Sequence, residues 1–370
     1  MNNFPLDQIF DPELLLNDDI SSLSFRSKKL YGDWILDLRK GKTFFGLNWN
    51  WPSTFDSDIS GFYDTYVFSW HVEDWPHAWL KDFCESHPDS QVIVLGEFSL
   101  CKNYYHLPNL KSLVHHCWHL LIPEVLQFDS HDYVPMHQRK QRLSSLVNKP
   151  SYFKSLTTAY LLKNYLGRDF IFSWNINLRK EICPSMNFLD EQYMTRREII
   201  ELCKFYHEQL KDKKHTLDNF NDTRFSNYYS SIPAYTDCLV NISNETYTQS
   251  FINGINLPGP FITDKTWKPL LAGCALLSQG SKGVYAYLEK FGFIFDYPWD
   301  NDYDLIDGDI DRYIAALEKL DDIFNLDFCF LANQLDRSTR YNYDYIRSHD
   351  FIKKIQLLNE KYFSDFYSNY

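Results

Sequence analysis

The feature that most constrains the fold of this chain is the repeated alternation of short, strand-like apolar runs with amphipathic helical segments. Such alternation is typical of parallel sheets covered by helices, because parallel strands require a long crossover between them. In the first part of the chain we predict strands at 33–38, 43–49, 65–70 and 91–96, and helices at 75–86 and 108–126. The helix at 75–86 joins two of these strands and completes one β-α-β unit.

A second series of elements begins near residue 141. We predict strands at 142–148, 169–174, 237–243, 274–278 and 293–296, and helices at 150–166, 192–212, 264–273, 281–291, from about 309, and over 350–370. The helix at 192–212 is predicted to open with a capping box, Thr195-Arg-Arg-Glu. We therefore expect two α/β domains, 1–140 and 141–348, and a C-terminal helix at 349–370. Many doubly wound proteins share this plan, so it does not define a function.

Composition and charge narrow the class of protein. The chain has 370 residues, a net charge of −12 and 18% aromatic residues. An acidic surface repels nucleic acid on average, although a local basic groove can override the mean. The eight cysteines include no C-x-x-C pair, which favours reduced thiols over a disulfide framework. No apolar run approaches the roughly 20 residues of a membrane span, and the N-terminus does not resemble a signal peptide. We expect a soluble cytoplasmic protein, in the host cytoplasm if it is viral.

The most informative stretch is a strand that ends in Glu245-Thr246, followed after a loop by a helix capped by Thr263 or Asp264. A strand end that faces a helix N-terminus forms a ligand crevice, because the helix dipole and its free N–H groups attract phosphate. Lys265 and Lys268 are predicted to lie in the first turn of this helix and to add positive charge for a diphosphate. Glu245 is placed to accept hydrogen bonds from ribose or sugar hydroxyls.

This stretch resembles the donor motif of α-1,3-fucosyltransferases and of related viral and bacterial glycosyltransferases. These proteins have a strand ending in Glu-Asn/Thr, then Ile-Thr-Glu-Lys, and a helix ending Ala-Gly before a short apolar strand; here the segment reads Ile262-Thr-Asp-Lys. The resemblance implies that Glu245, Asp264 and Lys265 bind a nucleotide sugar. It departs from the family at Asp264, where the usual residue is Glu.

The resemblance extends over roughly residues 140–320. Residues 288–296 and 302–312 look like the helix, Gly-Phe segment, acidic loop and Arg-bearing helix of these relatives, and 145–154 with 171–174 looks like their strand, basic helix and Ser-Trp segment. The relatives have Arg where this chain has Ser151 and Lys154, which suggests Lys154 as a phosphate ligand. The resemblance implies a GT-B-like fold, with two facing Rossmann-like domains and a C-terminal helix that crosses back.

A transfer that inverts the anomeric carbon needs a base to take the proton of the acceptor hydroxyl. The candidates follow the predicted strands at 65–70 and 91–96: Glu73, then Asp74, with His71 as an alternative, and Glu97, which is equally well placed. For each of them a helix cap or a solvated loop charge is an alternative interpretation.

Other patterns are weaker. His115, His116 and His119 include an i, i+4 pair that could hold zinc, but a helix face explains them, and we expect no metal. Residues 302–309 resemble a calcium loop, although Gly308 and a missing glutamate break the required spacing, so an Asp-rich helix start is the better account. Trp267 could be a core residue. The basic run at 137–142 could contact phosphates of donor or nucleic acid, or form a solvated hinge.

We expect a glycosyltransferase that moves a sugar from a nucleoside-diphosphate sugar to a hydroxyl acceptor, without a cofactor or metal and with inversion. Lysines and a helix N-terminus can stabilise the leaving diphosphate. The expected acceptor is a glycan. One alternative is a phage-type enzyme that glycosylates hydroxylated pyrimidines in DNA, which would have to reach a base outside the stack. The other is a non-catalytic sugar-binding relative.

Overall fold

The structure is a computed structural model that describes residues 35–40, 43–48, 63–70, 77–96, 107–114, 131–147, 152–174, 196–210, 233–245, 251–252, 255–256, 260, 262–351, 353–354 and 357. For β1, β2 and some ends of other elements it describes the backbone alone. The chain divides into two compact units: unit 1 contains residues 1–126, 251–258 and 352–370, and unit 2 contains residues 127–250 and 259–351.

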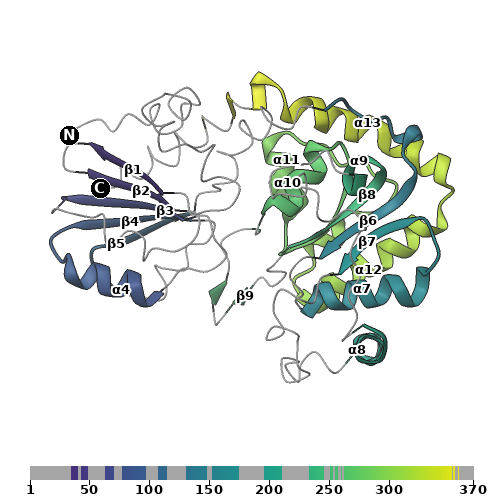
Figure 1. Cartoon of the computed structure of the whole chain (residues 1–370), viewed down its shortest axis with the longest axis horizontal. Coiled ribbons are helices and arrows are strands. Elements are labelled where there is room, and N and C mark those ends of the chain that lie inside the picture. The colour runs from purple at the N-terminus through teal and green to yellow at the C-terminus, as the bar shows by residue number, and fades with distance from the viewer. Residues whose placement is uncertain are drawn as a thin grey trace. The chain divides into compact units, whose positions relative to one another are not determined.

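Unit 1 contains a five-stranded sheet in the order β1-β2-β3-β4-β5 (Figure 1). The strands are β1 Ile35–Lys40, β2 Thr43–Asn48, β3 Thr65–Trp70, β4 Gln91–Gly96 and β5 Leu110–Val114. β1 and β2 are antiparallel, whereas β2 to β5 are parallel. Helix α4, His77–Ser86, connects β3 with β4 and confirms the predicted β-α-β unit.

The helix predicted at 108–126 is wrong at its start, because residues 110–114 form β5. The turn before this strand is held by the side-chain amide of Asn109, which donates to the carbonyl oxygens of Cys84, His87 and Ser90. The backbone carbonyl of Asn109 also accepts from Val92 N at 2.8 Å. These contacts place residues 110–114 beside β4, where they pair as a strand. Such tertiary pairing overrides the helix propensity of the segment.

The strand order in unit 1 also differs from the predicted Rossmann-like order. Each described strand from β1 to β5 pairs with the next one along the chain, so the order has no reversal. Right-handed crossovers that always advance in one direction lie on one face of a sheet. A doubly wound sheet requires a reversal of direction, and the described strands of unit 1 do not make one.

Unit 2 contains a four-stranded parallel sheet in the order β11-β8-β6-β7. Its strands are β6 Gln141–Val147, β7 Phe170–Trp174, β8 Cys238–Asn244 and β11 Ala275–Gln279. From β6 the chain proceeds to β7 on one side and then returns to β8 and β11 on the other. This sheet is therefore doubly wound, with its switch point between β6 and β8.

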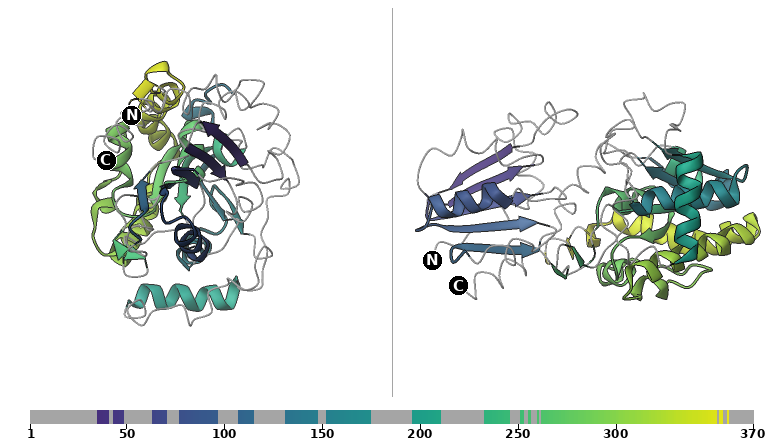
Figure 2. Two further views of the ribbon diagram at one scale, coloured as in Figure 1. Left: turned by 90° about the vertical axis from the view of Figure 1, so that its left-hand side faces the viewer. Right: turned by 90° about the horizontal axis from the view of Figure 1, so that it is seen from below.

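Helices cover both faces of this sheet (Figures 1 and 2). One face carries α7 Tyr152–Tyr165 and α12 Asp309–Asn325, with α8 Arg197–Gln209 outside α7. The other face carries α9 Pro233–Thr236, α10 Asp264–Leu271 and α13 Phe328–Ile346, and α11 Val284–Phe291 follows β11. β8 and β11 are buried along their whole length, as parallel strands covered on both faces should be.

The remaining elements are short. They are η2 Met136–Gln138, η6 Asp302–Leu305, β9 Phe251–Ile252 and β10 Ile255–Asn256. No described helix is both long and apolar enough to cross a membrane.

Three local predictions are corrected. Residues 293–296 are not a strand: the backbone of Ile294 is bonded through both N and O to the side-chain amide of Asn342 on α13, at 2.9 and 2.7 Å. The long helix from 309 ends at Asn325, and α13 begins anew with Asp327 accepting from Phe330 N at 2.9 Å. Helix α8 starts after Arg196, which makes no side-chain cap bond. Arg196 is extended, so the helix predicted at 192–212 does not run through this residue. Thr195, the predicted cap, lies outside the described residues.

Candidate functional site

The candidate site lies at the carboxyl edge of the sheet in unit 2. β8 ends at Asn244 and β11 ends at Gln279, and these two residues are direct partners in the ladder. The neighbouring β6 ends at Val147. Helices α7 and α10 both begin at this edge (Figure 1). In open α/β sheets, ligands bind beyond the carboxyl ends of the strands at the switch point, which here is the gap between β6 and β8.

Glu245, the first residue after β8, is wholly buried and bonded to the first turn of α10. Its Oε1 accepts hydrogen bonds from Thr263 N at 2.9 Å and from the Thr266 hydroxyl at 2.7 Å. Its Oε2 accepts from the Thr263 hydroxyl at 2.6 Å. The carboxylate therefore ties the end of the central strand to the helix N-terminus, where unpaired N–H groups need acceptors.

Lys265 provides positive charge next to this carboxyl. Its Nζ lies 3.3 Å from the Thr263 hydroxyl oxygen, which also accepts from Lys265 N as the N-cap of α10. Burial raises the pKa of the Glu245 carboxyl, and the Lys265 ammonium and the threonine hydrogen bonds oppose that rise. A buried carboxyl, its hydroxyl donors and a lysine thus form one connected group.

The start of α7 places a second lysine at the same edge. Lys154 lies in the first turn of α7 and is 4% exposed. One turn further on, the Thr157 hydroxyl lies 2.6 Å from Gln279 Oε1 and 3.1 Å from the Tyr313 hydroxyl of α12. This contact holds α7 against the end of β11, so the N-terminus of α7 has a fixed position on the sheet.

Two strand-end amides complete the edge. Asn244 donates through Nδ2 to the Ser145 hydroxyl of β6 at 3.0 Å. Asn244 Oδ1 and Gln279 Nε2 are buried and have no hydrogen-bond partner among the residues that the structure describes. Buried polar atoms normally have a partner. An acceptor at the end of β8 and a donor at the end of β11 are thus left without a partner by the described residues.

The acidic loop before α12 serves the structure of this edge. Asp304, in η6, accepts from Tyr285 N at the start of α11 at 2.9 Å. Burial raises the pKa of the Asp304 carboxyl to about 7. Arg312 donates to Asp309 at 2.6 Å and to the Ile306 carbonyl at 2.8 Å. The described residues contain no cluster of metal-ligating side chains, and the Asp-rich helix start accounts for this segment.

Some predicted site residues cannot be located. Outside the described residues lie His71, Glu73, Asp74, Glu97, His115, His116, His119 and Thr246, and the side chain of Asp264. The strands that precede the four candidate bases end side by side, because Trp70 of β3 and Gly96 of β4 are ladder partners. Each of these roles stays a prediction.

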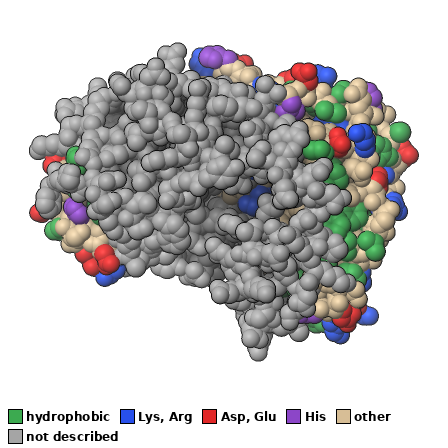
Figure 3. Space-filling model, viewed as in Figure 1, with side chains coloured by type: hydrophobic (Ala, Val, Ile, Leu, Met, Phe, Trp, Pro, Cys, Tyr) green, Lys and Arg blue, Asp and Glu red, His purple; other side chains and the backbone are tan. Residues whose placement is uncertain are grey.

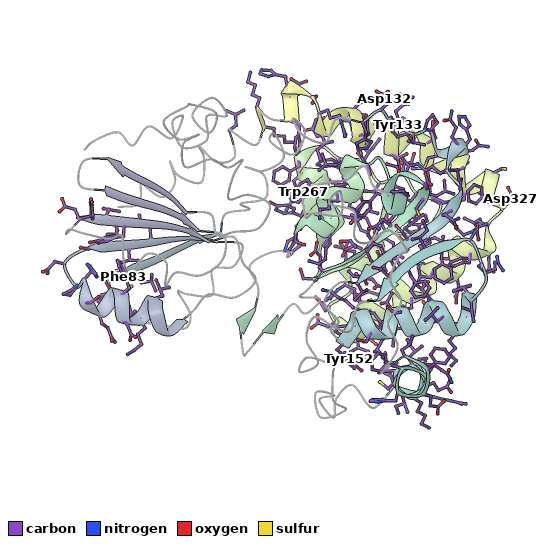
Figure 4. The ribbon with its side chains drawn as sticks, viewed as in Figure 1. Phe83, Asp132, Tyr133, Tyr152, Trp267 and Asp327 are labelled. Carbon is purple, nitrogen blue, oxygen red and sulfur yellow. The ribbon has the colours of Figure 1, made fainter. Side chains whose placement is uncertain are left out.

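Two other residues of α10, Lys268 and Trp267, are more deeply buried than Lys265. Lys268 lies in the last turn of this eight-residue helix, not in the first turn as predicted, and is 9% exposed. Trp267 is 2% exposed and packs near Phe293 and Phe351, with ring centroids 5.9 and 6.3 Å away (Figure 4). Trp267 is thus a core residue, which was the structural interpretation of the sequence.

The basic run at 137–142 is largely structural. The guanidinium of Arg139 is 3% exposed and donates to five carbonyl oxygens, those of Val134, Tyr235, Cys238, Ala272 and Gly273. Arg142 donates to the carbonyls of Ile323 and Leu326 at the end of α12. These two arginines are therefore occupied within unit 2 and do not form a phosphate-binding patch.

On the face seen in Figure 3, the described residues form no patch of acidic or of basic side chains alone, and side chains of both signs are interspersed in unit 2.

Sequence reasoning missed Asn244, Gln279 and Thr157. For Gln279 the available signal was a polar amide at the end of a strand that begins with three apolar residues, Ala275-Leu-Leu. Searches of protein-family models, curated proteins and solved structures found no match to this chain.

Proposed function

We propose that unit 2 binds a nucleoside-diphosphate sugar at the carboxyl edge of its sheet, and that the chain is a glycosyltransferase of the GT-B type in which the described strands of unit 1 follow one another without a reversal. The observation that carries this proposal is the strand order β11-β8-β6-β7. Its switch point lies at the residues that resemble the donor motif of α-1,3-fucosyltransferases. Topology and sequence motif thus support the same edge independently of each other.

The diphosphate is the part of the donor that this edge suits best. The N-termini of α7 and α10 both begin there, and helix N-termini favour anions through their dipoles and free N–H groups. Lys154 and Lys265 add two positive charges in the first turns of these helices. Asn244 Oδ1 and Gln279 Nε2 offer an acceptor and a donor for the nucleoside or the sugar.

In the proposed reaction, a base takes the proton of the acceptor hydroxyl while the oxygen of that hydroxyl attacks the anomeric carbon. The bond from that carbon to the diphosphate oxygen breaks, and the nucleoside diphosphate leaves with the electron pair. Lys265, Lys154 and the helix N-termini stabilise the negative charge that develops on the leaving group. Glu73 remains the first candidate for the base, followed by Asp74, Glu97 and His71.

We propose a glycan as the acceptor. One argument for a DNA acceptor, beside the phage-like composition and the many aromatic residues, was the basic run, and the guanidinium groups of Arg139 and Arg142 in that run are buried against backbone carbonyls. The net charge of −12 also favours an uncharged acceptor.

Donor binding tests the proposal. A panel of nucleotide sugars should include at least one that raises the melting temperature, because a ligand that binds only the native state stabilises it. For that sugar, Lys265→Ala should weaken binding about tenfold or more by calorimetry, since a hydrogen bond to a charged group contributes about 1.5–3 kcal/mol. Lys204→Ala is the matched control, because Lys204 is exposed on α8. No stabilisation by any donor, or equal binding by both variants, would refute the proposal.

A further inference from the structure

Glu245 is bonded more closely to the protein than a simple sugar ligand would be. Both of its carboxylate oxygens accept from the turn Thr263–Thr266, and the residue is 0% exposed. The Ser243 hydroxyl, two residues before it, lies 2.7 Å from the Thr266 hydroxyl and extends the same network. The carboxyl therefore fixes where α10 begins, and with it the direction of the N–H groups at that helix N-terminus.

Lys265 is the charged partner of this buried carboxyl. Its Nζ reaches the Thr263 hydroxyl at 3.3 Å, and that hydroxyl donates to Glu245 Oε2. Lys265 is half-buried, so its ammonium is closer to the surface than the carboxyl that it balances. The same ammonium is the predicted ligand of the donor diphosphate.

The charged groups on described elements near this edge also include Lys154 of α7, Lys268 of α10 and Arg312 of α12. On the side of β11, a Cβ added at Gly280 would lie 3.6 Å from Glu245 Cγ, so the backbone passes close to the carboxyl there. Arg312 reaches the Gly280 carbonyl at 3.5 Å, but its guanidinium is bonded to Asp309 and to the Ile306 carbonyl. Asp264 opens α10 with a side chain that lies outside the described part. Lys265 is the charged group whose ammonium opposes the effect of burial on the pKa of Glu245.

We propose that Glu245 is a positioning residue for the diphosphate site and that it takes up a proton when a nucleoside diphosphate binds and draws the Lys265 ammonium away from it. The inference rests on the proposed function. The carboxylate gains one proton from solvent at Oε2 and becomes a neutral carboxylic acid, and the Thr263 hydroxyl, which donates to Oε2 in the free protein, then accepts from the new O–H. Its oxygens can still accept from Thr263 N and Thr266, so α10 keeps its position while the site accommodates the charge of the phosphates.

Two physical effects act in the same direction. The carboxyl loses the nearby positive charge that opposes the effect of burial, and the phosphates bring negative charge close to it. Both effects disfavour the ionised form of a buried acid. Because the carboxyl has no contact with solvent, water does not screen them.

The test is calorimetric titration of UDP or GDP into the full chain at pH 7, in buffers with different ionisation enthalpies. The slope of the observed enthalpy against the buffer enthalpy gives the number of protons taken up. We expect the wild type to take up a substantial fraction of one proton more than Glu245→Gln. Glu289→Gln should match the wild type, because Glu289 is exposed on α11. Titration of the terminal phosphate contributes equally in all three proteins, so the difference isolates Glu245.

A second variant tests proton uptake by Glu245 if Glu245→Gln fails to fold. Thr266→Val keeps the carboxyl but removes the hydroxyl that donates to Oε1 at 2.7 Å. Loss of this donor raises the pKa of Glu245 in both the free and the bound protein, so the pH window of proton uptake should move upward. Binding with equal proton uptake in the wild type and Glu245→Gln, or an unmoved window in Thr266→Val, would overturn the inference alone. Absence of binding in the wild type would overturn the proposed function as well.

Discussion

Arg139 offers the most demanding test of the structure of unit 2. Arg139 is 3% exposed, and its side chain donates to five carbonyl oxygens that belong to the segments before β6, β8 and β11 and to the first residue of β8. In Arg139→Met these acceptors lose their donor, and a buried acceptor without a donor costs about 1–3 kcal/mol. The sum, about 5–15 kcal/mol, is as large as the whole stability of a typical domain.

The observed loss should be smaller than this sum. Water can enter the vacated space, and removal of the buried charge also removes its desolvation cost. We therefore expect Arg139→Met to lower the free energy of unfolding by about 4 kcal/mol. Arg139→Lys should lose about half of that, because an ammonium has three donors and lacks the planar fork of a guanidinium.

Urea unfolding followed by circular dichroism measures these differences by linear extrapolation. Lys140→Met is the matched control, because its Nζ is 3.6 Å from Asp237, its side chain is 74% exposed, and exposed pairs contribute about 0–1 kcal/mol. If Arg139→Met were as stable as the control, the guanidinium would not hold these segments together. The basic run would then again be available for a ligand.

Two further predictions concern stability. Gly292→Ala should be clearly less stable in thermal melts than Gly167→Ala. Both glycines have a positive φ, 106° at Gly292 and 85° at Gly167. A Cβ added at Gly292 would lie 2.6 Å from Tyr345 Oη, whereas a Cβ added at Gly167 would have no atom within 4 Å. Equal losses would show that only backbone strain, about 1 kcal/mol, is involved. Burial raises the pKa of Asp304 from 3.8 to about 7. Between these pH values the folded state therefore binds more protons at this residue than the unfolded state. The contribution of Asp304 to wild-type stability should fall as pH rises from about 4 to about 7, by at most about 1.4 kcal/mol per pH unit. In urea unfolding measured at several pH values, Asp304→Asn should reduce the dependence of the free energy of unfolding on pH. Asp302→Asn is the control and should leave it unchanged, because Asp302 is exposed. An unchanged pH dependence in Asp304→Asn would contradict the raised pKa of Asp304.

Periodicity located most elements of unit 2 because their apolar runs are long and bounded by clear signals. β6, α7, β7, β8 and α10 lie within a few residues of their predicted positions. The stretch at 108–114 was misread because its preference is weak, and pairing with β4 through the turn at Asn109 decides its state. The segment at 293–296 has the composition of a strand, but the backbone of Ile294 within it is bonded to the side chain of Asn342.

The sequence predicted where in the fold the candidate site lies, but not the contacts that its residues make. The motif at 262–265 led to the edge where α10 begins, because strand ends and helix starts meet there in any doubly wound sheet. The environment of Glu245 was not predictable, since Thr263 and Thr266 reach it only after the helix docks on β8. The internal role of Arg139 likewise depends on carbonyls from distant segments.

The two sheets differ in how far apart along the chain their neighbouring strands lie, and this difference affects the order of folding. Among the described residues of unit 1, each ladder joins strands that follow one another in sequence. In unit 2, the strands on either side of the switch point are distant: Ser144 and Asn241 are ladder partners 97 residues apart. Closing a longer loop costs more entropy, and pairing at long range is slow. We therefore expect the proposed donor crevice to be among the last parts of the protein to form during folding, so a newly made chain gains affinity for its donor only once the fold is nearly complete.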